Sequence, residues 1–440
     1  MAVPTKLNNA NLASIATPAN QQSSSSSKPV QTPTYNRNGV TEGIVHIGVG
    51  GFHRAHLAVI AKLANPDTRI VSMTITESGY HYNENTHQLE AHNPDIAADV
   101  AASDLSSPRT TYGYLYAGLE RRRKAGLKPF TVLSCDNMQK NGTITRNMLI
   151  SFARLRDADM ADWIEKNGAF PNSMVDRITP RTTDADKVSL ADEFAVEDAW
   201  PVVTEPFMQW VVEDVFANGR PDFDKVGVQV VGSVHEVEKF ECHKLRLLNA
   251  SHTAVSYAAY LGGFEYVHEV FANPLFHKYI YNMMHLEVKP LLPAIPGVDI
   301  DKYCDKLLER FSNPTIMDQI TRLTLNGSGK LPQFIMPSVA EQIMAGTHNF
   351  RRLVFCVASW FRYLNGTDEH GKAYEIDDPM ADDLKARALK GGKSPFPLFD
   401  VKSLFGDDLR GDKKLVDELT ACLESFYNEG AMATLAKYVD

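Results

Sequence analysis

Residues 43–56, GIVHIGVGGFHRAH, decide the fold. The letters IVHI form a short apolar run rich in β-branched residues, which is typical of a buried strand, and GVGG follows as a glycine turn. A buried strand that enters a glycine turn and then opens a helix is the usual start of a dinucleotide-binding domain. Glycines let the backbone approach a pyrophosphate, and the helix N-terminus supplies N–H donors. The alternative is a tight strand–helix turn without a ligand.

The glycine turn supplies the candidate cofactor-binding residues. They are Gly48, Gly50, Gly51, Phe52 and Arg54. The match to the pattern G-x-G-x-x-G is imperfect, because the third glycine would fall at His53. An acid that binds the ribose hydroxyls is expected at the end of the second strand. Glu77 closes the next β-branched run, but it lies far from Gly48, and a solvated acid at a strand end is the simpler interpretation.

Further strands alternate with helices along the first half of the chain. Residues 69–76, 130–137 and 226–234 are β-branched runs, and a helical pattern follows the second of them. Short apolar strands that alternate with helices predict a doubly wound parallel sheet, as in an α/β Rossmann-type domain. Beyond about residue 236 strand-like runs nearly disappear, and long helical periods broken by prolines predict a mostly α-helical domain.

The chain of 440 residues is too long for one ordinary core, so we expect several parts. Residues 1–40 are polar, contain a run of serines at 23–27, and are predicted to form a disordered or loosely docked tail. Residues 41–235 are predicted to form the Rossmann-type domain. Residues 236–440 are predicted to form the helical domain that carries the substrate and catalytic groups.

Composition and charge exclude several classes of protein. The net charge of −9 argues against binding to nucleic-acid phosphates, and no apolar run is long enough to cross a membrane. The five cysteines are scattered without a CxxC motif or a Cys/His cluster, so we expect no metal site and a reducing compartment. No basic stretch followed by an apolar core opens the chain, so we expect a cytoplasmic location. The oligomeric state stays open, and a monomer is compatible with the sequence.

Residues 243–257, HKLRLLNASHTAVSY, hold the candidate catalytic groups. Their apolar spacing is helical, and at about 100° per residue Lys244, His252 and Asn249 fall at about 0°, 80° and 140°. All three can line one broad, partly apolar face, where a lysine loses solvation. Oxidation of an alcohol without a metal needs such a base, together with N–H donors for the developing alkoxide. The alternative is a solvated lysine, a helix-interior asparagine and a core histidine.

Asn137 is a second candidate donor. It stands at the end of the predicted strand 130–137, and ligands bind at the carboxyl ends of strands in open α/β sheets. Cys135, in the same strand, is interpreted as packing and not as a nucleophile, because no base is near it in the sequence.

Six segments together resemble one family. They are GVGGFHRAH (48–56), TITESGY (74–80), SCDNMQKNG (134–142), FPNSMVDRITP (170–180), VTEPFMQWVVED (203–214) and KLRLLNASH (244–252). In this combination the chain is similar to the long-chain polyol-specific dehydrogenases, also called the mannitol dehydrogenase family, over roughly residues 43–337. The resemblance implies a Rossmann-type domain and a helical domain, no zinc, and interconversion of D-mannitol and D-fructose with NAD.

The resemblance also implies a role for each matched residue of the catalytic set. Lys244 matches the general base of the family. Asn137 and Asn249 match its two oxyanion donors. His252 matches a residue that contacts a substrate hydroxyl.

Three further positions gain a role only through the resemblance. Arg322 and Lys330, in TRLTLNGSGKLP, match positions that hold the distal hydroxyls of the polyol, a task that suits long side chains with several donors. Asp176, in VDRITP, matches a cofactor-side position. Without the resemblance, Arg322 and Lys330 would be interpreted as solvated charges near a glycine-rich loop. Asp176 would be a turn carboxylate that caps a backbone N–H.

The chain departs from the family pattern after Val59. In the family, the first helix continues there into a second strand, a helix and a further strand. In this chain, Val59 is followed at once by Ile60-Ala61-Lys62, which match a later part of the pattern. The missing part should include the strand whose end carries the ribose-binding acid, so Glu77 is not that acid. Loss of a strand–helix segment should leave a gap in the sheet and expose apolar helix faces.

Three functions stay open at this point. The first is an active NAD-dependent enzyme for D-mannitol and D-fructose, with Lys244 as the base. The second is a related dehydrogenase for arabinitol, sorbitol or a sugar acid such as fructuronate. The third is a shortened form with impaired NAD binding and little activity.

Overall fold

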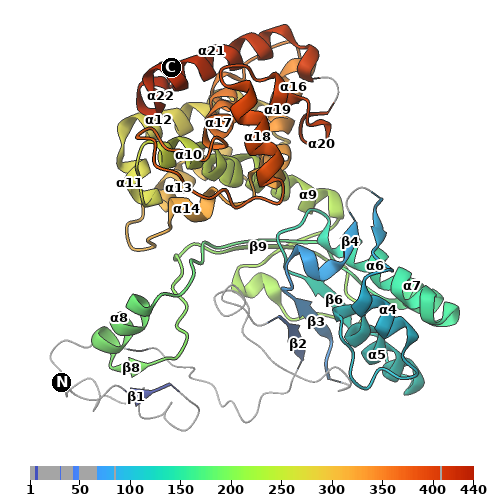
Figure 1. Cartoon of the computed structure of the whole chain (residues 1–440). Helices are drawn as coiled ribbons and strands as arrows, with labels where there is room; N and C mark the ends of the chain where they lie inside the picture. The colour runs from blue at the N-terminus through green and yellow to red at the C-terminus, as the bar shows by residue number, and fades with distance from the viewer. Residues whose placement is uncertain (1–4, 8–29, 31–42, 49–66, 84–85, 407–408) are drawn as a thin grey trace. The chain divides into compact units, whose positions relative to one another are not determined.

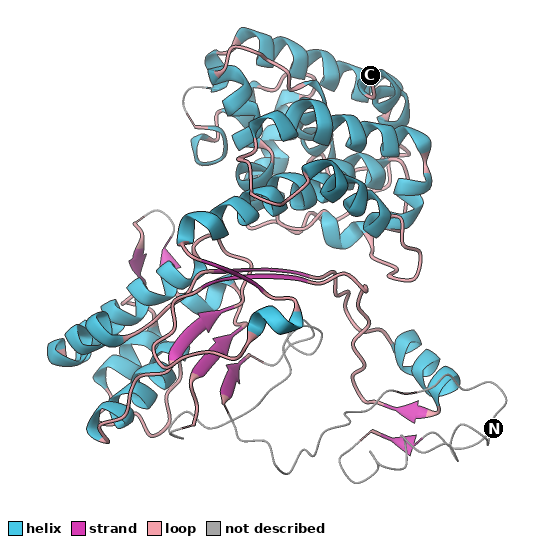
Figure 2. Ribbon diagram, turned by 180° about the vertical axis from the view of Figure 1, so that it is seen from behind, coloured by secondary structure: helices cyan, strands magenta, loops and turns pink. Residues whose placement is uncertain are grey.

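The computed structural model of the chain describes residues 5–7, 30, 43–48, 67–83, 86–406 and 409–440. It separates into two compact units, Met1–Glu238 and Lys239–Asp440 (Figure 1). The predicted division between residues 235 and 236 lies close to this one. The predicted Rossmann-type and helical domains are confirmed, and all described strands belong to the first unit (Figure 2).

A parallel sheet of three strands forms the centre of the first unit. In spatial order the strands are β2 (Ile44–Ile47), β3 (Ile70–Met73) and β6 (Thr131–Ser134). Side chains alternate between the two faces, so that Ile70 and Leu133 enter one apolar cluster while Val71, Met73 and Val132 enter another. Both faces are therefore buried, which explains why the sequence shows continuous β-branched runs here.

Four helices bury one face of this sheet. They are α4 (Pro94–Ala101), α5 (Thr111–Lys124), α6 (Asn141–Arg156) and α7 (Ala158–Asn167). Their starts follow local capping rules, since Thr110 caps α5 and Asp157 caps α7 through side-chain oxygens that accept backbone N–H groups. A short helix η2 (Glu77–Tyr80) and a small hairpin, β4 (Tyr82–Asn83) with β5 (Gln88–Leu89), connect β3 to α4.

The opposite face packs against a second sheet. Its central strand β9 (Gln209–Glu213) pairs in parallel with β10 (Gln229–Val231) and antiparallel with β7 (Ser173–Asp176). The helix η3 (Phe223–Val226) precedes β10. The sequence predicted only residues 226–234 as a strand here. The antiparallel β7 is a departure from the purely parallel sheet that was expected.

Strand β2 pairs with β3 on one side, and no other described strand pairs with it. The expected second strand of a Rossmann-type domain therefore has no counterpart beside β2 among the described residues. The join between Val59 and Ile60 lies outside the described residues. The predicted cofactor-binding residues Gly50, Gly51, Phe52 and Arg54 lie outside them as well.

One segment of the predicted tail is structured. Strand β1 (Thr5–Lys6) pairs in parallel with β8 (Val196–Glu197), which follows helix α8 (Asp184–Phe194). A capping box between Thr183 and Asp186 begins this helix. The predicted disordered tail is therefore wrong for residues 5 and 6. Strand β8, far along the chain, supplies the backbone hydrogen bonds that this short polar segment cannot form by itself.

The second unit is helical throughout its described residues. A continuous helical stretch opens it, made of α9 (Val234–His243), the π-helix η4 (Lys244–Asn249) and α10 (Ala250–Leu261). The helices and helical turns that follow are α11 (Val267–Ala272), α12 (Pro274–Asn282), the π-helix η5 (Met283–Val288), η6 (Lys289–Leu291), α13 (Ile300–Phe311), α14 (Ile320–Leu323), α15 (Gly327–Phe334), α16 (Met336–Met344), α17 (Arg351–Tyr363), α18 (Ala381–Gly391), α19 (Phe396–Phe399), α20 (Lys402–Phe405), η7 (Leu409–Gly411), α21 (Lys413–Glu429) and α22 (Ala431–Tyr438).

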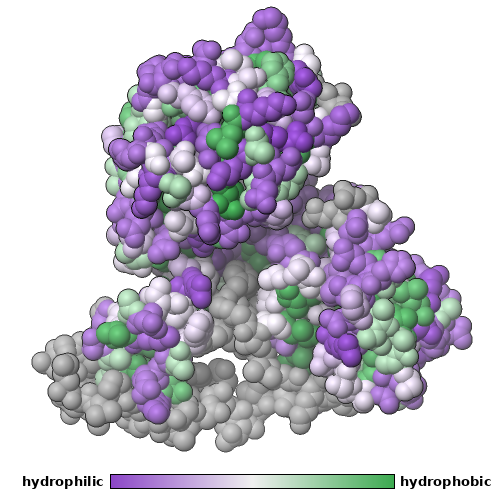
Figure 3. Space-filling model, viewed as in Figure 1, coloured by the Kyte–Doolittle hydropathy of each residue, from purple (hydrophilic) through white to green (hydrophobic). Residues whose placement is uncertain are grey.

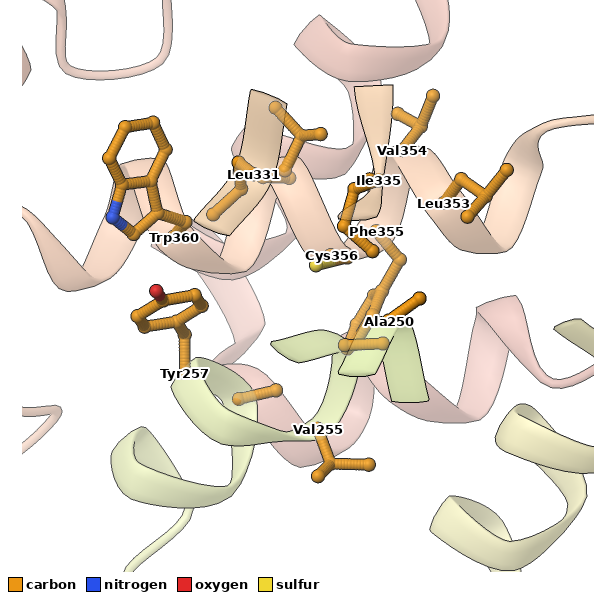
Figure 4. Packing of buried hydrophobic residues seen from close by; sticks show 14 of the residues in the cluster. Ala250, Val255, Tyr257, Leu331, Ile335, Leu353, Val354, Phe355, Cys356 and Trp360 are labelled. Carbon is orange, nitrogen blue, oxygen red and sulfur yellow. The ribbon is translucent and has the colours of Figure 1, made fainter. Parts of the chain in front are cut away.

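Helices α10 and α17 form the centre of the helical core. Nearly every residue of both is buried, and they pack side by side (Figure 4). Tyr257 of α10 and Trp360 of α17 face one another, with ring centroids 6.5 Å apart. Gly327 opens α15 against this pair, where a Cβ would lie 2.3 Å from the indole nitrogen of Trp360. The close approach fixes where α15 begins.

The outer surface of the helical unit is mostly hydrophilic on the face seen in Figure 3. In the part of the chain that the structure describes, none of the helices has the length and apolar character that a membrane span requires.

Candidate active site

Lys244 and Asn249 begin and end a π-helical turn, η4, within the stretch that the sequence predicted as a regular α-helix. The N–H of Ala250 donates to the carbonyl of Leu245, five residues earlier, as a π-helix requires. Residues i and i+5 then stack one turn apart on the same face, whereas in an α-helix they would differ by about 140°. The predicted angles are therefore wrong for this turn, and the change places Lys244 and Asn249 on one face.

Hydrogen bonds to helix α16 and to Pro293 hold the π-turn. Both carboxylate oxygens of Glu341 accept from the buried Arg246 at 2.9 Å, and Ser338 Oγ accepts from its Nε at 2.9 Å. His243, directly before the turn, donates from Nε2 to the carbonyl of Pro293 at 2.7 Å. Burial lowers the pKa of His243, which favours this neutral tautomer. π-Turns of this kind occur frequently at functional sites.

The three predicted catalytic residues of the helical unit occupy one continuous stretch. Lys244 is buried, with 7% of its surface exposed, and Asn249 and His252 are half-buried. The ring of His252 packs on Phe311 of α13, with the centroids 4.5 Å apart. The carbonyl of Asn249 accepts from Thr253 Oγ1 at 3.0 Å, which ties the end of the π-turn to α10.

Arg322 and Lys330 lie on helices that pack against this stretch. α14, which carries Arg322, contacts α10, and α15, which carries Lys330, contacts both α10 and η4. The Lys330 ammonium donates to the carbonyl of Leu323 at 3.1 Å. Burial, with a smaller contribution from Arg322, lowers the pKa of Lys330 to about 8, and Asp318 partly opposes this shift. Arg322 and Lys330, the basic pair, therefore belong to the same helical unit as Lys244.

Asp318 is the partner of Arg322, and it was not among the predicted residues. Its buried carboxylate accepts from two nitrogens of Arg322, and Nε lies 2.6 Å from Oδ1. The spacing of an acid four residues before an arginine is a recognised helix-pair signal and could have drawn attention to it.

In the first unit, Gly48 ends the β2 strand in a conformation that only glycine adopts easily. Its φ is 89°, and a Cβ would lie 1.9 Å from the carbonyl oxygen of Thr74. His46 Nε2 lies 2.7 Å from the Gly48 carbonyl oxygen, and Thr74 Oγ1 donates to the same oxygen at 2.7 Å. His46 Nδ1 is 2.9 Å from Ser72 Oγ. The entry to the predicted phosphate turn is therefore fixed by β3.

Asp136 organises the carboxyl end of the sheet. Its carboxylate accepts from the N–H groups of Ile75 and Thr76 at 3.0 and 2.9 Å, and from the Tyr80 hydroxyl at 2.6 Å. Burial and the nearby Asp136 charge raise the pKa of Tyr80, so the phenol stays protonated and donates. Asp136 was not among the predicted residues, although it stands at the end of the same predicted strand as Asn137 and the strand-end rule applies to both.

Asn137 and Asp176 occupy two strand ends of the first unit. Asn137 is exposed just beyond β6, as predicted, whereas Asp176 is the buried last residue of β7. Asp176 is thus part of a strand and not of a turn. Cys135 is buried, and burial raises the pKa of its thiol, in agreement with a packing role.

Two family models match the chain. The Mannitol dehydrogenase Rossmann domain matches residues 57–225, and the Mannitol dehydrogenase C-terminal domain matches residues 236–427. The chain belongs to the mannitol dehydrogenase family. The match to the first model begins after β2 and the glycine turn.

Curated members of the mannitol dehydrogenase family are similar over nearly the whole chain. A mannitol 2-dehydrogenase of Aspergillus oryzae is 54% identical and covers 99% of this chain and 100% of its own length. A mannitol 2-dehydrogenase of Pyricularia oryzae is 54% identical and covers 94% of this chain and 96% of its own length.

Two solved structures share the fold. A ternary complex of Pseudomonas fluorescens mannitol 2-dehydrogenase with NAD and D-mannitol has a TM-score of 0.83 and 36% identity, covering 98% of this chain and 99% of that one. A D-sorbitol dehydrogenase in substrate-free form has a TM-score of 0.81 and 30% identity, covering 92% of this chain and 96% of that one.

The alignment to the Aspergillus oryzae family member also measures what this chain lacks. It extends over 508 positions, whereas 99% of 440 residues is about 436, so roughly 70 positions are gaps in this chain. A shortfall of this size agrees with the segment that the sequence analysis expects to be missing after Val59.

Proposed function

We propose that this chain is an NAD-dependent oxidoreductase that interconverts D-mannitol and D-fructose. Family membership and the likeness to a relative solved with NAD and D-mannitol support this function. The observation that carries the proposal is the buried π-turn of the helical unit, which sets Lys244 and Asn249 on one face beside the helices of Arg322 and Lys330.

Lys244 is the proposed general base. Its amine takes the proton of the hydroxyl group on the carbon that is oxidised, and its burial keeps bulk water from competing for that proton. The side-chain amides of Asn137 and Asn249 donate to the oxygen as negative charge develops on it. A bound nicotinamide ring supplies the acceptor for the hydride. His252 binds a neighbouring hydroxyl and so orients the reacting carbon.

Arg322 and Lys330 are the proposed contacts for the distal hydroxyls. A polyol offers only hydroxyl oxygens, and side chains with several N–H donors can bind two or more of them at once. Contacts at the far end of the substrate stabilise the bound orientation in which the reacting carbon meets Lys244.

The residues that the structure describes fit an NAD pyrophosphate at the end of β2. Gly48 brings the backbone close without a side chain, and the hydrogen bonds of His46 and Thr74 fix its carbonyl. On the resemblance, Gly50, Gly51, Phe52 and Arg54 complete the phosphate turn. Asp176 is proposed on the same ground as a cofactor-side residue.

The test is the formation of NADH from NAD⁺ with D-mannitol, and its consumption with D-fructose. We expect mannitol to have the highest kcat/KM in a panel that also contains arabinitol, sorbitol and the sugar acid fructuronate. A higher value for sorbitol would instead favour the activity named for the second structural neighbour. A higher value for fructuronate would assign Arg322 or Lys330 to a carboxylate.

A second candidate is a shortened form that binds NAD poorly. It is favoured by the roughly 70 alignment gaps and by a β2 strand with one described neighbour. Calorimetric titration with NADH separates the two, since micromolar affinity contradicts the impaired form. A chimera that carries the missing segment of the Aspergillus oryzae relative between Val59 and Ile60 should gain affinity only if this second candidate is correct.

We further infer a cytoplasmic location, which five free cysteines support, because free thiols persist in reducing compartments. The oligomeric state stays open, and sedimentation would determine it.

A further inference from the structure

Three charged side chains of the helical unit form one cluster. Asp318 precedes α14, Arg322 lies in α14, and Lys330 lies in α15. The side chain of Asp318 is 6% exposed, whereas 48% of the Arg322 side chain is exposed. The cluster therefore has a buried anion behind an accessible guanidinium.

The segment that carries Asp318 is fixed by its backbone. The Asp318 carbonyl accepts from Val267 N–H at 2.9 Å, and Ile320 N–H donates to the Glu265 carbonyl at 2.9 Å. Between them, Gln319 and Tyr266 form an antiparallel bridge. Since its backbone is anchored on both sides, the Asp318 carboxylate is a rigid acceptor and not a mobile surface acid.

Arg322 binds Asp318 along one edge of its guanidinium. Nε and Nη2 donate to the two carboxylate oxygens, and Nη1 has no hydrogen-bond partner in the described part of the chain. The outer edge, formed by Nη1 and the second N–H of Nη2, therefore stays available. Two parallel N–H groups fit two neighbouring hydroxyl oxygens as well as they fit a carboxylate.

The charge of Asp318 then decides which of these ligands is favoured. Arg322 and Lys330 alone would present two positive charges, which attract carboxylates and phosphates. With Asp318 the cluster carries one positive charge when Lys330 is protonated and none when it is neutral. A nearly neutral cluster gains little from binding an anion, while its hydrogen bonds to hydroxyl groups persist.

We propose that Asp318 is a positioning and specificity-determining residue: it holds Arg322 with its outer edge toward the substrate and makes the Arg322–Lys330 pair select neutral polyols over anionic sugar acids. The inference rests on the proposed substrate contacts of Arg322 and Lys330. It extends them to a residue that touches no substrate itself and acts through Arg322.

The decisive experiment is Asp318→Asn, assayed with D-mannitol and with D-mannonate, which carries a carboxylate at one end. We expect the KM for mannitol to rise about tenfold with kcat changed less than about threefold, because a distal hydroxyl contact is loosened. The ratio of kcat/KM for mannonate to that for mannitol should rise by about tenfold or more. An unchanged ratio overturns the proposal.

Two further variants separate charge from position. Asp318→Glu keeps the charge but displaces the carboxylate, so it should impair the KM for mannitol and preserve the preference for the neutral substrate. Asp383→Asn is the matched control, because Asp383 and Arg387 form an exposed i,i+4 ion pair in the same unit. If this control shifts the substrate ratio as much as Asp318→Asn does, the effect is not specific to the cluster and the proposal fails.

A readout without turnover keeps this inference distinct from the proposed function. The pKa of Lys330, followed by NMR of the isotopically methylated amine, should fall in Asp318→Asn and stay unchanged in Asp383→Asn, since Asp318 raises it. An unchanged pKa of Lys330 in a folded Asp318→Asn chain contradicts the role of Asp318. Absence of mannitol turnover in the unmodified chain, with the pKa shift present, contradicts only the proposed function.

Discussion

The two units of this chain differ in how much of the expected family domain their described residues contain. In the helical unit the proposed base Lys244, its π-turn, and the pair Arg322 and Lys330 all lie on helices that pack against one another. In the sheet unit the carboxyl strand ends are well organised, yet β2 has a single described strand neighbour and the alignment lacks roughly 70 positions. Catalytic chemistry and cofactor binding can therefore fail independently, and each needs its own measurement.

The largest effect is expected at Lys244. Lys244→Ala should lower kcat by roughly 10²–10⁴-fold, because no other base takes the hydroxyl proton, while NADH affinity stays as in the unmodified chain. Steady-state rates and a calorimetric NADH titration check the two parts. Lys302→Ala, at an exposed lysine of the same unit, is the control. Normal rates in Lys244→Ala would show that the base is a different group.

A buried carboxylate in each unit gives the next comparison. Glu287 is fully buried and accepts from Arg352 Nη1 and from the N–H groups of Arg352 and Leu353 at the start of α17. Glu287→Ala leaves Arg352 buried without this partner, and we expect a loss of about 3–5 kcal/mol in the free energy of unfolding. Denaturant unfolding measures it, with Glu309→Ala as the exposed control.

Asp136→Ala is the counterpart in the sheet unit. It frees the N–H groups of Ile75 and Thr76 at the strand ends, so we expect weaker NADH binding together with a stability loss of about 1–3 kcal/mol. If Glu287→Ala, measured under folding conditions, retains the NADH affinity that Asp136→Ala loses, cofactor binding depends on the sheet unit and not on the stability of the helical unit. Equal effects of both variants on NADH affinity would mean that the units do not fail independently.

Gly48→Ala tests the glycine turn directly. A methyl group there collides with the Thr74 carbonyl and must also accept a φ of 89°, so we expect a cost of about 1–3 kcal/mol and reduced NADH affinity. Gly43→Ala is the matched control at the start of the same strand, because a Cβ there meets nothing within 4 Å. If both variants bind NADH equally well, Gly48 does not shape the cofactor turn.

The smallest effect concerns pH. The pKa of Lys330 is lowered to about 8, so its ammonium is charged below that pH and becomes a weaker donor above it. The KM for mannitol should therefore rise a few-fold as the pH passes about 8. Lys330→Arg keeps its charge and should give a flat KM over the same range. A KM that rises equally in both proteins would place the titrating group elsewhere.

Local sequence signals predicted most of the parallel sheet and nearly all of the helical unit. Residues 44–47, 70–73 and 131–134 are buried on both faces, so their β-branched runs are continuous and easy to recognise. β7 and β9 were missed because their apolar runs are short and are flanked by polar residues, as in SMVD and QWVVE.

The identity of the candidate catalytic residues stays a prediction, whereas the regular α-helix expected around Lys244 was wrong for one turn. An α-helix and a π-turn share nearly the same apolar spacing, and the choice between them depends on distant partners such as Glu341 and Pro293. Asp318 was missed for a related reason. Its spacing to Arg322 is visible in the sequence, but its burial depends on the bridge to residues 265–267.

The π-turn also has a consequence for how this family can diverge. It holds one more residue per turn than its α-helical flanks, so a deletion of a single residue within 245–248 would restore a regular α-helix. That deletion would leave Asn249 four residues after Lys244, so the two residues would stand about 40° apart on a regular α-helix and one residue closer along its axis. We therefore expect homologous chains to vary more in the identity of Leu245, Leu247 and Leu248 than in the number of residues between Lys244 and Asn249.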